Sequence, residues 1–557
     1  MSLAIPRRTA LAILAAAGAA CTAAPEPTAA SLANNIFRHG VASGDPDTTS
    51  VVLWTRVESS LPAEAVKWHV ARDEAFTSVV AAGESTARVE GDHTVKVLVE
   101  GLDPGGSYFY RFAARGADSP IGRTRTLPEG GVARLGVALV SCSNHAFGFF
   151  NAYDAIARDP EIDLVLHTGD YIYEYGADEW GGDVARAIGR AHEPANEIVS
   201  LADYRQRHAQ YKRDAGSLAM LAAHPLIACW DDHESANNPW TDGAQNHQVE
   251  SEGAWSARRA ASIQAYYEWM PIREPHAGRA RAEFWRVYRF GDLATIVTLE
   301  TRHTGRGRQV NYAEHFERIT NRESRDAFMR DVIGDPSRRM LSEAMENDLR
   351  SALQASVSAA QPWRLIGNAS PMARMLVPDV AALGVDRAHN RNGAALGAAP
   401  DLFWTGRWNL PFYTDTWDGY PAARQRFYEL CREAGASDLL VLTGDSHSFW
   451  MNSLYDDDGR PMGLELGTAG VTSPGDFVES GWDAQTAAQL DRIFAEQLHE
   501  VEWTDNMHQG YVRVVLSREQ AVATFIGVDT VLSPQYRTVE LRRAEIVRAD
   551  DNLRYGV

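Results

Sequence analysis

The chain has 557 residues, of which 45% are hydrophobic and 23% charged, a composition typical of a globular protein and not of a fibrous, disordered or polytopic membrane protein. Its 54 Lys+Arg and 74 Asp+Glu give a net charge of −20, which argues against nucleic acid as a specific partner. Four cysteines are too few to imply a disulfide framework.

Residues 1–30 are predicted to be a twin-arginine signal peptide. Arg7-Arg8 precedes a short apolar stretch at 10–20, which is too short to span a bilayer as a helix. The arginine pair favours the twin-arginine export machinery. Lipid attachment at Cys21, which follows small residues, is an alternative to simple cleavage near Ala30. We therefore expect an exported protein, periplasmic or secreted, with no transmembrane span in the mature chain.

Residues 35–128 are predicted to form an all-β domain. Short apolar or alternating runs separated by turn residues indicate a β-sandwich, and they are Ser50–Arg56, Val66–Val70, Val95–Val99 and Tyr108–Phe112. The Leu-x-Pro-Gly-x-x-Tyr-x-Tyr run at 102–110 resembles a fibronectin type III module. Residues 126–131 are typical of a linker to the next domain.

The character changes to α/β from residue 132 onward. The apolar runs predicted to be buried strands are Leu135–Val140, Leu164–Leu166, Pro225–Ala228, Ala294–Leu299 and Leu439–Leu442. Helix-like segments between them, such as 217–223 and 343–357, indicate a sheet covered by helices on both faces. Residues 184–274 are rich in predicted helix and are expected to cover one end of the sheet. Residues 511–526 predict a hairpin.

Four polar clusters directly follow predicted strands. They contain Ser141-Cys142, Gly169-Asp170 with Tyr173, Asp231-Asp232-His233 with Asn237-Asn238, and Gly444-Asp445 with His447. Because ligands bind at the carboxyl ends of strands in α/β sheets, we expect the clusters to converge. Each residue alone has a structural alternative as a buried thiol, a turn former or a packed aromatic ring. Their recurrence favours a metal site, and the adjacent carboxylates of Asp231 and Asp232 are costly without cations.

These clusters together resemble the PhoD-type alkaline phosphatases, a branch of the calcineurin-like metallophosphoesterases. The segment 37–46 and the motif at 416–421 resemble the family as well. The resemblance implies an α/β metallophosphoesterase sandwich of two mixed sheets flanked by helices, at 132–545. It also implies a preceding all-β domain of the fibronectin III or Ig-like type.

The resemblance implies a centre with one ferric ion (Fe3+) and two calcium ions (Ca2+). The residues that it assigns to the metals are Cys142, Asp170, Tyr173, Asp232, Asn237, Asn238, Asp445 and His447. The thiolate and phenolate suit iron, with Asp445 or His447 nearby. Asp170 would bridge to calcium, which prefers carboxylate and amide oxygens.

The expected function is that of an exported, metal-dependent alkaline phosphatase, in which a hydroxide activated by the metals attacks phosphorus. Asp232 and His233 are the predicted catalytic residues, although His233 has an equal structural alternative. Arg302 and Arg374 are candidates to bind a phosphate oxygen, against purely structural roles.

The expected substrates are small-molecule phosphate esters, or phospholipid and teichoic-type diesters. A phosphodiesterase or phospholipase D-like activity on the same site is the alternative function. A rival of another class is an exported binding protein with a decayed site. Two departures from the family pattern, Glu300 in place of the usual Asp and the segment 367–370, are expected to affect the substrate pocket and not the metal motifs.

Overall fold

The computed structural model describes residues 36–390, 401–549 and 551–556. The predicted signal peptide, with Arg7-Arg8 and Cys21, lies outside the described residues. Among the helices of these ranges, none combines the length and the apolar character needed to cross a membrane.

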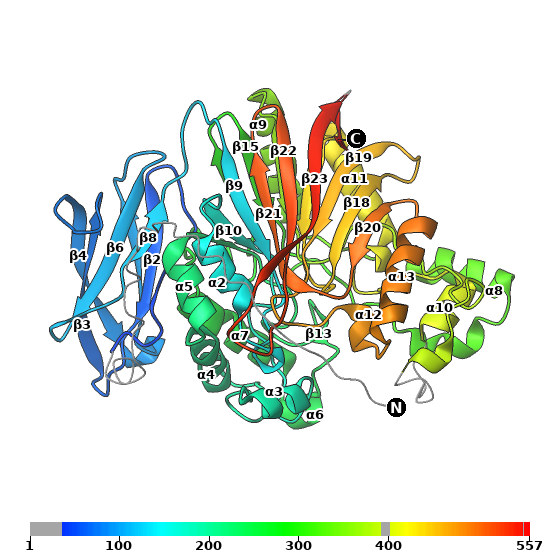
Figure 1. The fold of residues 1–557 in the computed structure, drawn as a ribbon, viewed down its shortest axis with the longest axis horizontal. Coiled ribbons are helices and arrows are strands. Elements are labelled where there is room, and N and C mark those ends of the chain that lie inside the picture. The colour runs from blue at the N-terminus through cyan, green and yellow to red at the C-terminus, as the bar shows by residue number, and fades with distance from the viewer. Residues whose placement is uncertain (1–35, 391–400, 550, 557) are drawn as a thin grey trace, which may run out of the picture. The chain divides into compact units, whose positions relative to one another are not determined.

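A mixed sheet of ten strands, whose central strands β9 (Leu135–Val140), β10 (Leu164–His167) and β21 (Gln509–Leu516) are labelled in Figure 1, supplies the strands that precede three of the four polar clusters in the chain. In spatial order its strands are β24 (Asn552–Tyr555), β23 (Thr538–Ala549), β22 (Gln520–Val528), β21, β9, β10, β11 (Leu226–Ala228), β1 (Val41–Gly44), β2 (Ser50–Arg56) and β5 (Thr94–Glu100). Strands β9, β10 and β11 are parallel neighbours, with Leu166 opposite Leu139 on one side and Ile227 on the other. Their carboxyl ends therefore lie at the same edge of the sheet.

A second mixed sheet has seven strands and carries the fourth cluster. Its order is β14 (Val287–Phe290), β15 (Ala294–Thr298), β16 (Trp363–Gly367), β17 (Leu439–Thr443), β19 (Pro461–Gly467), β18 (Phe449–Tyr455) and β20 (Val501–Asp505). Strands β15, β16, β17 and β19 are parallel, and the pairs β14–β15, β18–β19 and β18–β20 are antiparallel.

The two sheets pack face to face through one apolar core. Leu139 and Leu166 from the first sheet share it with Leu365 and Leu442 from the second. Helices α2 (Asn151–Arg158), α4 (Leu201–Lys212), α5 (Ala215–Ala223) and α7 (Trp255–Trp269) pack on the outer face of the first sheet. Helices α9 (Glu343–Ser358) and α11 (Pro421–Glu433) pack on the outer face of the second.

The observed layers confirm two mixed sheets flanked by helices. They differ from the single sheet with helices on both faces that the strand–helix alternation indicated. The apolar runs are buried on both faces, and they do not reveal whether a helix or a second sheet covers each face.

The N-terminal part of the described chain is rich in β-structure. A sheet of β4 (Val79–Arg88), β3 (Ala63–Ala71), β6 (Ser107–Ala114), β7 (Ala117–Asp118) and β8 (Gly122–Arg125) packs on β2 and β5. Strands β1, β2 and β5 themselves belong to the ten-stranded sheet, because β1 pairs with β11 as a parallel neighbour. The domain boundary near 128–132 stays a prediction.

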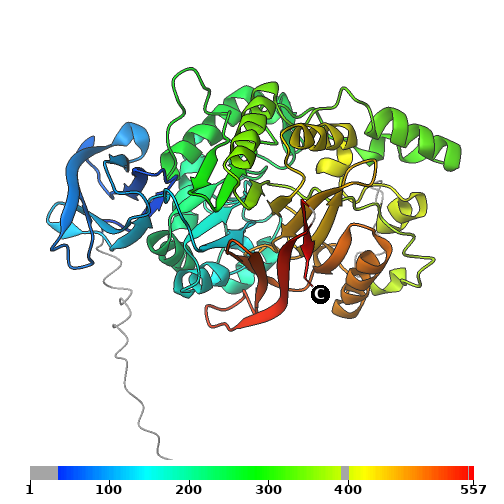
Figure 2. The ribbon, with the colours of Figure 1, turned by 90° about the horizontal axis from the view of Figure 1, so that it is seen from above.

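Smaller elements complete the fold. They are the hairpin β12 (Pro239–Trp240) and β13 (Gly243–Ala244), and the helices α3 (Gly182–Ile188), α6 (Val249–Glu252), α8 (Arg322–Phe328), α10 (Leu402–Trp408), α12 (Asp476–Glu479) and α13 (Ala484–Gln497). In two perpendicular views the blue N-terminal strands lie at one end, and the green and yellow-green helices α8 and α10 lie at the other (Figures 1 and 2).

Candidate metal centre

Four strand-end segments meet between the two sheets. Cys142 follows β9, Asp170 follows β10 and Asp232 follows β11, so all three emerge from neighbouring parallel strands of the first sheet. Asp445 and His447 follow β17 of the second sheet. A bridge between Ser141 and Gly470 ties the two strand-end regions together.

The backbone turns sharply where it presents these side chains. Left-handed φ values occur at Cys142 (61°), Asp170 (55°), Asp445 (64°) and His447 (54°). This conformation is uncommon for non-glycine residues and concentrates at functional sites. The preceding Gly169, with φ 105°, allows the closest approach, because a Cβ there would lie 2.4 Å from the Cβ of Asp231.

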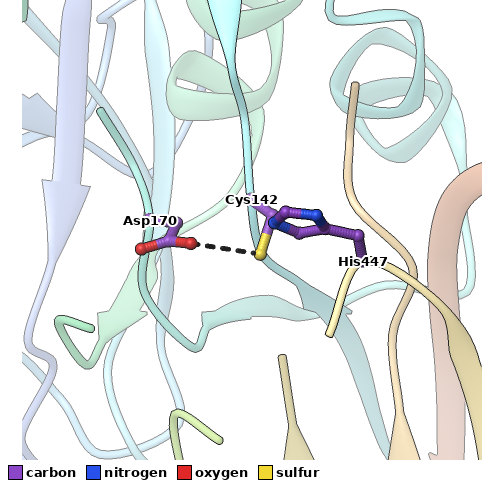
Figure 3. A group of neighbouring side chains, drawn as sticks. All are labelled: Cys142, Asp170 and His447. Carbon is purple, nitrogen blue, oxygen red and sulfur yellow. Dashed lines mark hydrogen bonds between the residues drawn. The ribbon is translucent and has the colours of Figure 1, made fainter. Parts of the chain in front are cut away.

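The first group of donors combines a thiol, a carboxylate, a phenol and an imidazole. The Cys142 thiol lies 3.4 Å from Asp170 Oδ2, and the Tyr173 hydroxyl donates to the same oxygen at 3.1 Å. The Tyr173 oxygen also lies 3.3 Å from His447 Nε2. Figure 3 shows His447 reaching Cys142 and Asp170 from a different segment of the chain. Cys142, Asp170 and His447 each place one donor atom within 4.8 Å of the others.

The second group consists of carboxylates around Asp232. Asp231, Asp232 and Asp445 form one set of donor atoms within 4.8 Å, and Asp170, Asp232 and His233 form another. Asp170 and Asp232 thereby connect the two groups. Asp231 was not among the predicted ligands, although its pairing with Asp232 in the sequence was the available signal.

Burial sets the electrostatics of the centre. It raises the pKa of Asp170 well above its ordinary value, an effect that His233 opposes and Asp232 reinforces. It also raises the pKa of the Cys142 thiol, the Tyr173 phenol and the Asp445 carboxyl, with neighbouring acidic groups adding to the shift. The protein alone therefore disfavours the anionic forms of these groups, and a cation among them would reverse that preference.

Two buried carboxylate oxygens, Asp231 Oδ2 and Asp232 Oδ1, have no hydrogen-bond partner. Nδ1 of His447 is likewise buried without a hydrogen-bond partner, and it lies 3.8 Å from Glu479 Oε2. Unpaired buried carboxylate oxygens cost free energy unless a cation compensates them. Hard oxygen donors beside a thiol, a phenol and an imidazole thus fit a site for more than one metal ion.

Arg302 supplies the fixed positive charge of the centre. Its fully buried guanidinium donates to Asp231 Oδ1 at 2.5 Å and lies 3.4 Å from carboxylate oxygens of Asp415 and Asp445. Asp232 Oδ1 is 3.8 Å away. Arg302 therefore neutralises carboxylates of the candidate metal site, a role that sequence reasoning missed together with Asp415.

His233 is held by Glu174, another residue that sequence reasoning missed. The imidazole Nδ1 lies 2.6 Å from Glu174 Oε2, while Nε2 lies 3.9 Å from Asp232 Oδ2. Burial opposes the imidazolium, but Asp232 and Glu174 outweigh it and raise the pKa of His233 well above its ordinary value. Burial acts to raise the pKa of Asp232, yet His233 and Arg302 hold it below its ordinary value.

Of the remaining candidates, Asn237 and Asn238 lie beside the centre and Arg374 does not. The backbone N–H of Asn238 donates to Asp232 Oδ2 at 2.9 Å, and that of Asn237 donates to Glu174 at 2.7 Å, so both lie beside the centre. Arg374 is not brought to it. Its guanidinium binds Glu500 at 2.5 Å and also contacts Asp457 and the carbonyl of Tyr455. These contacts tie Arg374 to residues outside the centre, and its phosphate-binding role stays a prediction.

The two departures from the family pattern have structural explanations. Glu300 is fully buried and accepts the backbone N–H groups of Arg302, His303 and Thr304 at 2.8, 2.6 and 2.9 Å. It therefore shapes the loop that presents Arg302. Asn368, from the segment 367–370, is buried and hydrogen-bonds within that segment to Ser370 at 2.6 Å.

Two mixed sheets pack face to face and carry metal-type donors at their strand ends. This fold and this site define the protein as a phosphoesterase-like α/β sandwich. The family model for PhoD-like phosphatases matches residues 137–525, and the model for the N-terminal domain of that family matches 21–128. Alkaline phosphatase D of Bacillus subtilis (strain 168) is 34% identical over 519 residues, which are 89% of this chain and 78% of that protein.

A solved structure of PhoD matches with a TM-score of 0.74 and 30% identity, covering 93% of this chain and 92% of that one. The chain belongs to the PhoD-like phosphatase family, and its enzyme class is that of the phosphoric ester hydrolases.

Proposed function

We propose that this chain is an exported, metal-dependent alkaline phosphatase that hydrolyses phosphate esters. The observation that carries the proposal is a buried cluster in which some carboxylate oxygens lack a hydrogen-bond partner. The cluster consists of Cys142, Asp170, Tyr173, Asp232 and His447. The proposal that the protein is exported rests on the sequence of residues 1–30. The N-terminal β-region is proposed to be a fibronectin III or Ig-like module.

We propose that the centre holds one Fe3+ and two Ca2+, the ions that the family resemblance implies, and its sulfur, nitrogen and oxygen donors fit them. Cys142, Asp170 and Tyr173 would hold the iron, with His447 or Asp445 nearby, and Asp170 would also hold calcium. The proposed calcium ligands are Asp231, Asp232, Asn237, Asn238 and Asp445. When bound, these cations supply the positive charge that stabilises phosphate oxygens and acidifies the attacking water.

The chain's own residues orient the reaction. Glu174 fixes Nδ1 of His233, so Nε2 is the atom that carries a proton toward the leaving oxygen. Arg302 keeps Asp231 and Asp445 in place by charge. Because nearly all of these groups are buried, bulk water is excluded from the reacting atoms, which strengthens each electrostatic interaction.

The test is elemental analysis of the purified protein, with p-nitrophenyl phosphate hydrolysis measured before chelation, after it and after calcium is added back. We expect bound iron and calcium, loss of activity on chelation and recovery with calcium. Asp170→Asn should lower kcat at least about a hundredfold, a typical cost of losing a central electrostatic group. The matched control is Asp118→Asn, an exposed aspartate on β7.

Three outcomes would overturn the proposal. They are a folded Asp170→Asn protein with the wild-type rate, a protein without transition metal or calcium, and activity that survives complete chelation. Hydrolysis of bis-p-nitrophenyl phosphate without hydrolysis of the monoester would replace phosphatase by phosphodiesterase on the same site.

A further inference from the structure

Few side chains at the candidate metal centre retain exposed surface. Cys142, Asp170 and Tyr173 are at most 1% exposed, whereas the Asp445 side chain is 17% exposed. Trp180 also retains exposed surface. It follows the segment of Asp170 and Tyr173 and precedes α3, and the predicted chemistry gave it no role.

The Trp180 indole lies against both imidazoles of the centre. Its ring centroid is 5.7 Å from that of His447 and 6.2 Å from that of His233, with interplanar angles of 20° and 19°. Tyr173 lies 5.4 Å away at 49°. A flat aromatic side chain thus stands beside His447 of the candidate metal centre and beside His233, which is proposed to protonate the leaving oxygen.

The neighbours of Trp180 hold it in this position. The rings of Phe147 and Tyr175 make edge-to-face contacts with the indole. Their centroids lie 4.8 and 5.6 Å from that of Trp180, with interplanar angles of 66° and 68°. Gly181 has φ 86°, and a Cβ there would lie 2.9 Å from the Phe147 ring. The indole is therefore preorganised and costs little conformational entropy when a ligand contacts it.

We propose that Trp180 is a specificity-determining residue that stacks on the leaving group and favours phosphate esters of planar, aromatic alcohols. The inference rests on the proposed function and names a preferred substrate class for its site. A partly exposed indole beside a phosphate site gains contact and loses hydration when a planar ring covers it. A saturated leaving group of similar size makes the poorer contact.

The experiment compares two inhibitors of the metal-loaded enzyme, phenylphosphonate and cyclohexylphosphonate. At a pH well above both second pKa values they carry the same charge. They have the same carbon number and differ in the planarity of the ring. We expect the wild-type enzyme to bind the phenyl compound more tightly. The measured ratio is the inhibition constant of cyclohexylphosphonate divided by that of phenylphosphonate. In Trp180→Leu and Trp180→Met this ratio should fall about tenfold, and in Trp180→Phe it should stay close to the wild-type value. The control is Trp68→Leu, another partly exposed tryptophan, on β3 of the N-terminal sheet.

A wild-type enzyme without preference between the two phosphonates overturns the inference before any variant is made. An equal rise of both inhibition constants in Trp180→Leu or Trp180→Met also overturns it, since that result assigns Trp180 a structural role. Failure of the proposed function is distinct, because a metal-loaded wild-type enzyme would then hydrolyse no phosphate ester at all.

Discussion

Glu174 connects two parts of the candidate metal centre through one buried carboxylate. Its Oε2 lies 2.6 Å from His233 Nδ1, and its Oε1 accepts the N–H of Asn237 at 2.7 Å and the side-chain amide of Asn246 at 2.8 Å. A carboxylate that orients an imidazole fixes both the ring and the nitrogen that carries the proton. Glu174 is thus a positioning residue for His233.

Glu174→Gln should lower kcat about tenfold to a hundredfold with a smaller change in KM, because a neutral amide orients the His233 ring less firmly. The measurement is steady-state kinetics on p-nitrophenyl phosphate, with circular dichroism to verify the fold. Glu179→Gln, an exposed change in the same segment, should leave kcat within about twofold. An unchanged kcat in Glu174→Gln would show that His233 is oriented without it.

At the level of single residues, the sequence pointed to candidate metal-binding side chains more readily than to the carboxylates that hydrogen-bond to them. Cys142, Asp170 and Asp232 stand out because each follows an apolar run directly. Glu174 and Glu234 do not, because their contacts join positions that are far apart in the chain. Glu234, for example, accepts the N–H groups of Asp170 and Tyr171 at 3.1 and 2.7 Å, more than sixty positions earlier.

The loop after β15 likewise depends on contacts that the sequence does not reveal. Its conformation depends on Glu300, which binds three consecutive backbone N–H groups and the Trp230 indole at 3.2 Å. The sequence showed only that Glu stands where the family resemblance suggested Asp. The structure shows that the longer side chain spans the loop and sets the position of Arg302.

Glu300→Asp should destabilise the protein by about 1–3 kcal/mol, because a side chain shorter by one methylene leaves some of these buried N–H groups unpaired. Chemical unfolding monitored by fluorescence measures the loss. Glu540→Asp, at an exposed strand position, is the matched control and should change stability by less than about 0.5 kcal/mol. Equal stabilities of the two variants would contradict the role assigned to Glu300.

Strand prediction succeeded where apolar runs were continuous, as at β2 and β9, whose predicted and observed bounds agree. The hairpin of β21 and β22 was also predicted correctly. Strand β16 was missed because Arg364 interrupts its apolar run. That arginine is buried and pairs with Asp438 at 2.6 Å, a compensation that periodicity does not reveal.

For the whole molecule, one sheet unites the N-terminal strands with the strands that carry the candidate centre. Lys212 on α4 lies where these parts meet. Its Nζ is 5.0 Å from the ring centroid of Trp54 on β2 and 3.1 Å from the hydroxyl of Tyr171, the residue after Asp170. Lys212 is fully buried, and no carboxylate among the described residues forms an ion pair with it. Burial lowers its pKa to about 7.

Lys212 should make the folded protein more stable as pH rises from about 7 to 10.5. In this window the unfolded chain binds a proton on Lys212 that the folded chain has released, so the free energy of unfolding increases by up to about 1.4 kcal/mol per pH unit. This added stability is lost as pH falls from 10.5 to about 7, and well below 7 Lys212 is protonated in both the folded and the unfolded chain. Urea unfolding of wild type and Lys212→Met across this range measures the difference in slope, since other titrating groups are common to both. Parallel curves for the two proteins would show that Lys212 remains protonated in the fold, held by the rings of Trp54 and Tyr171.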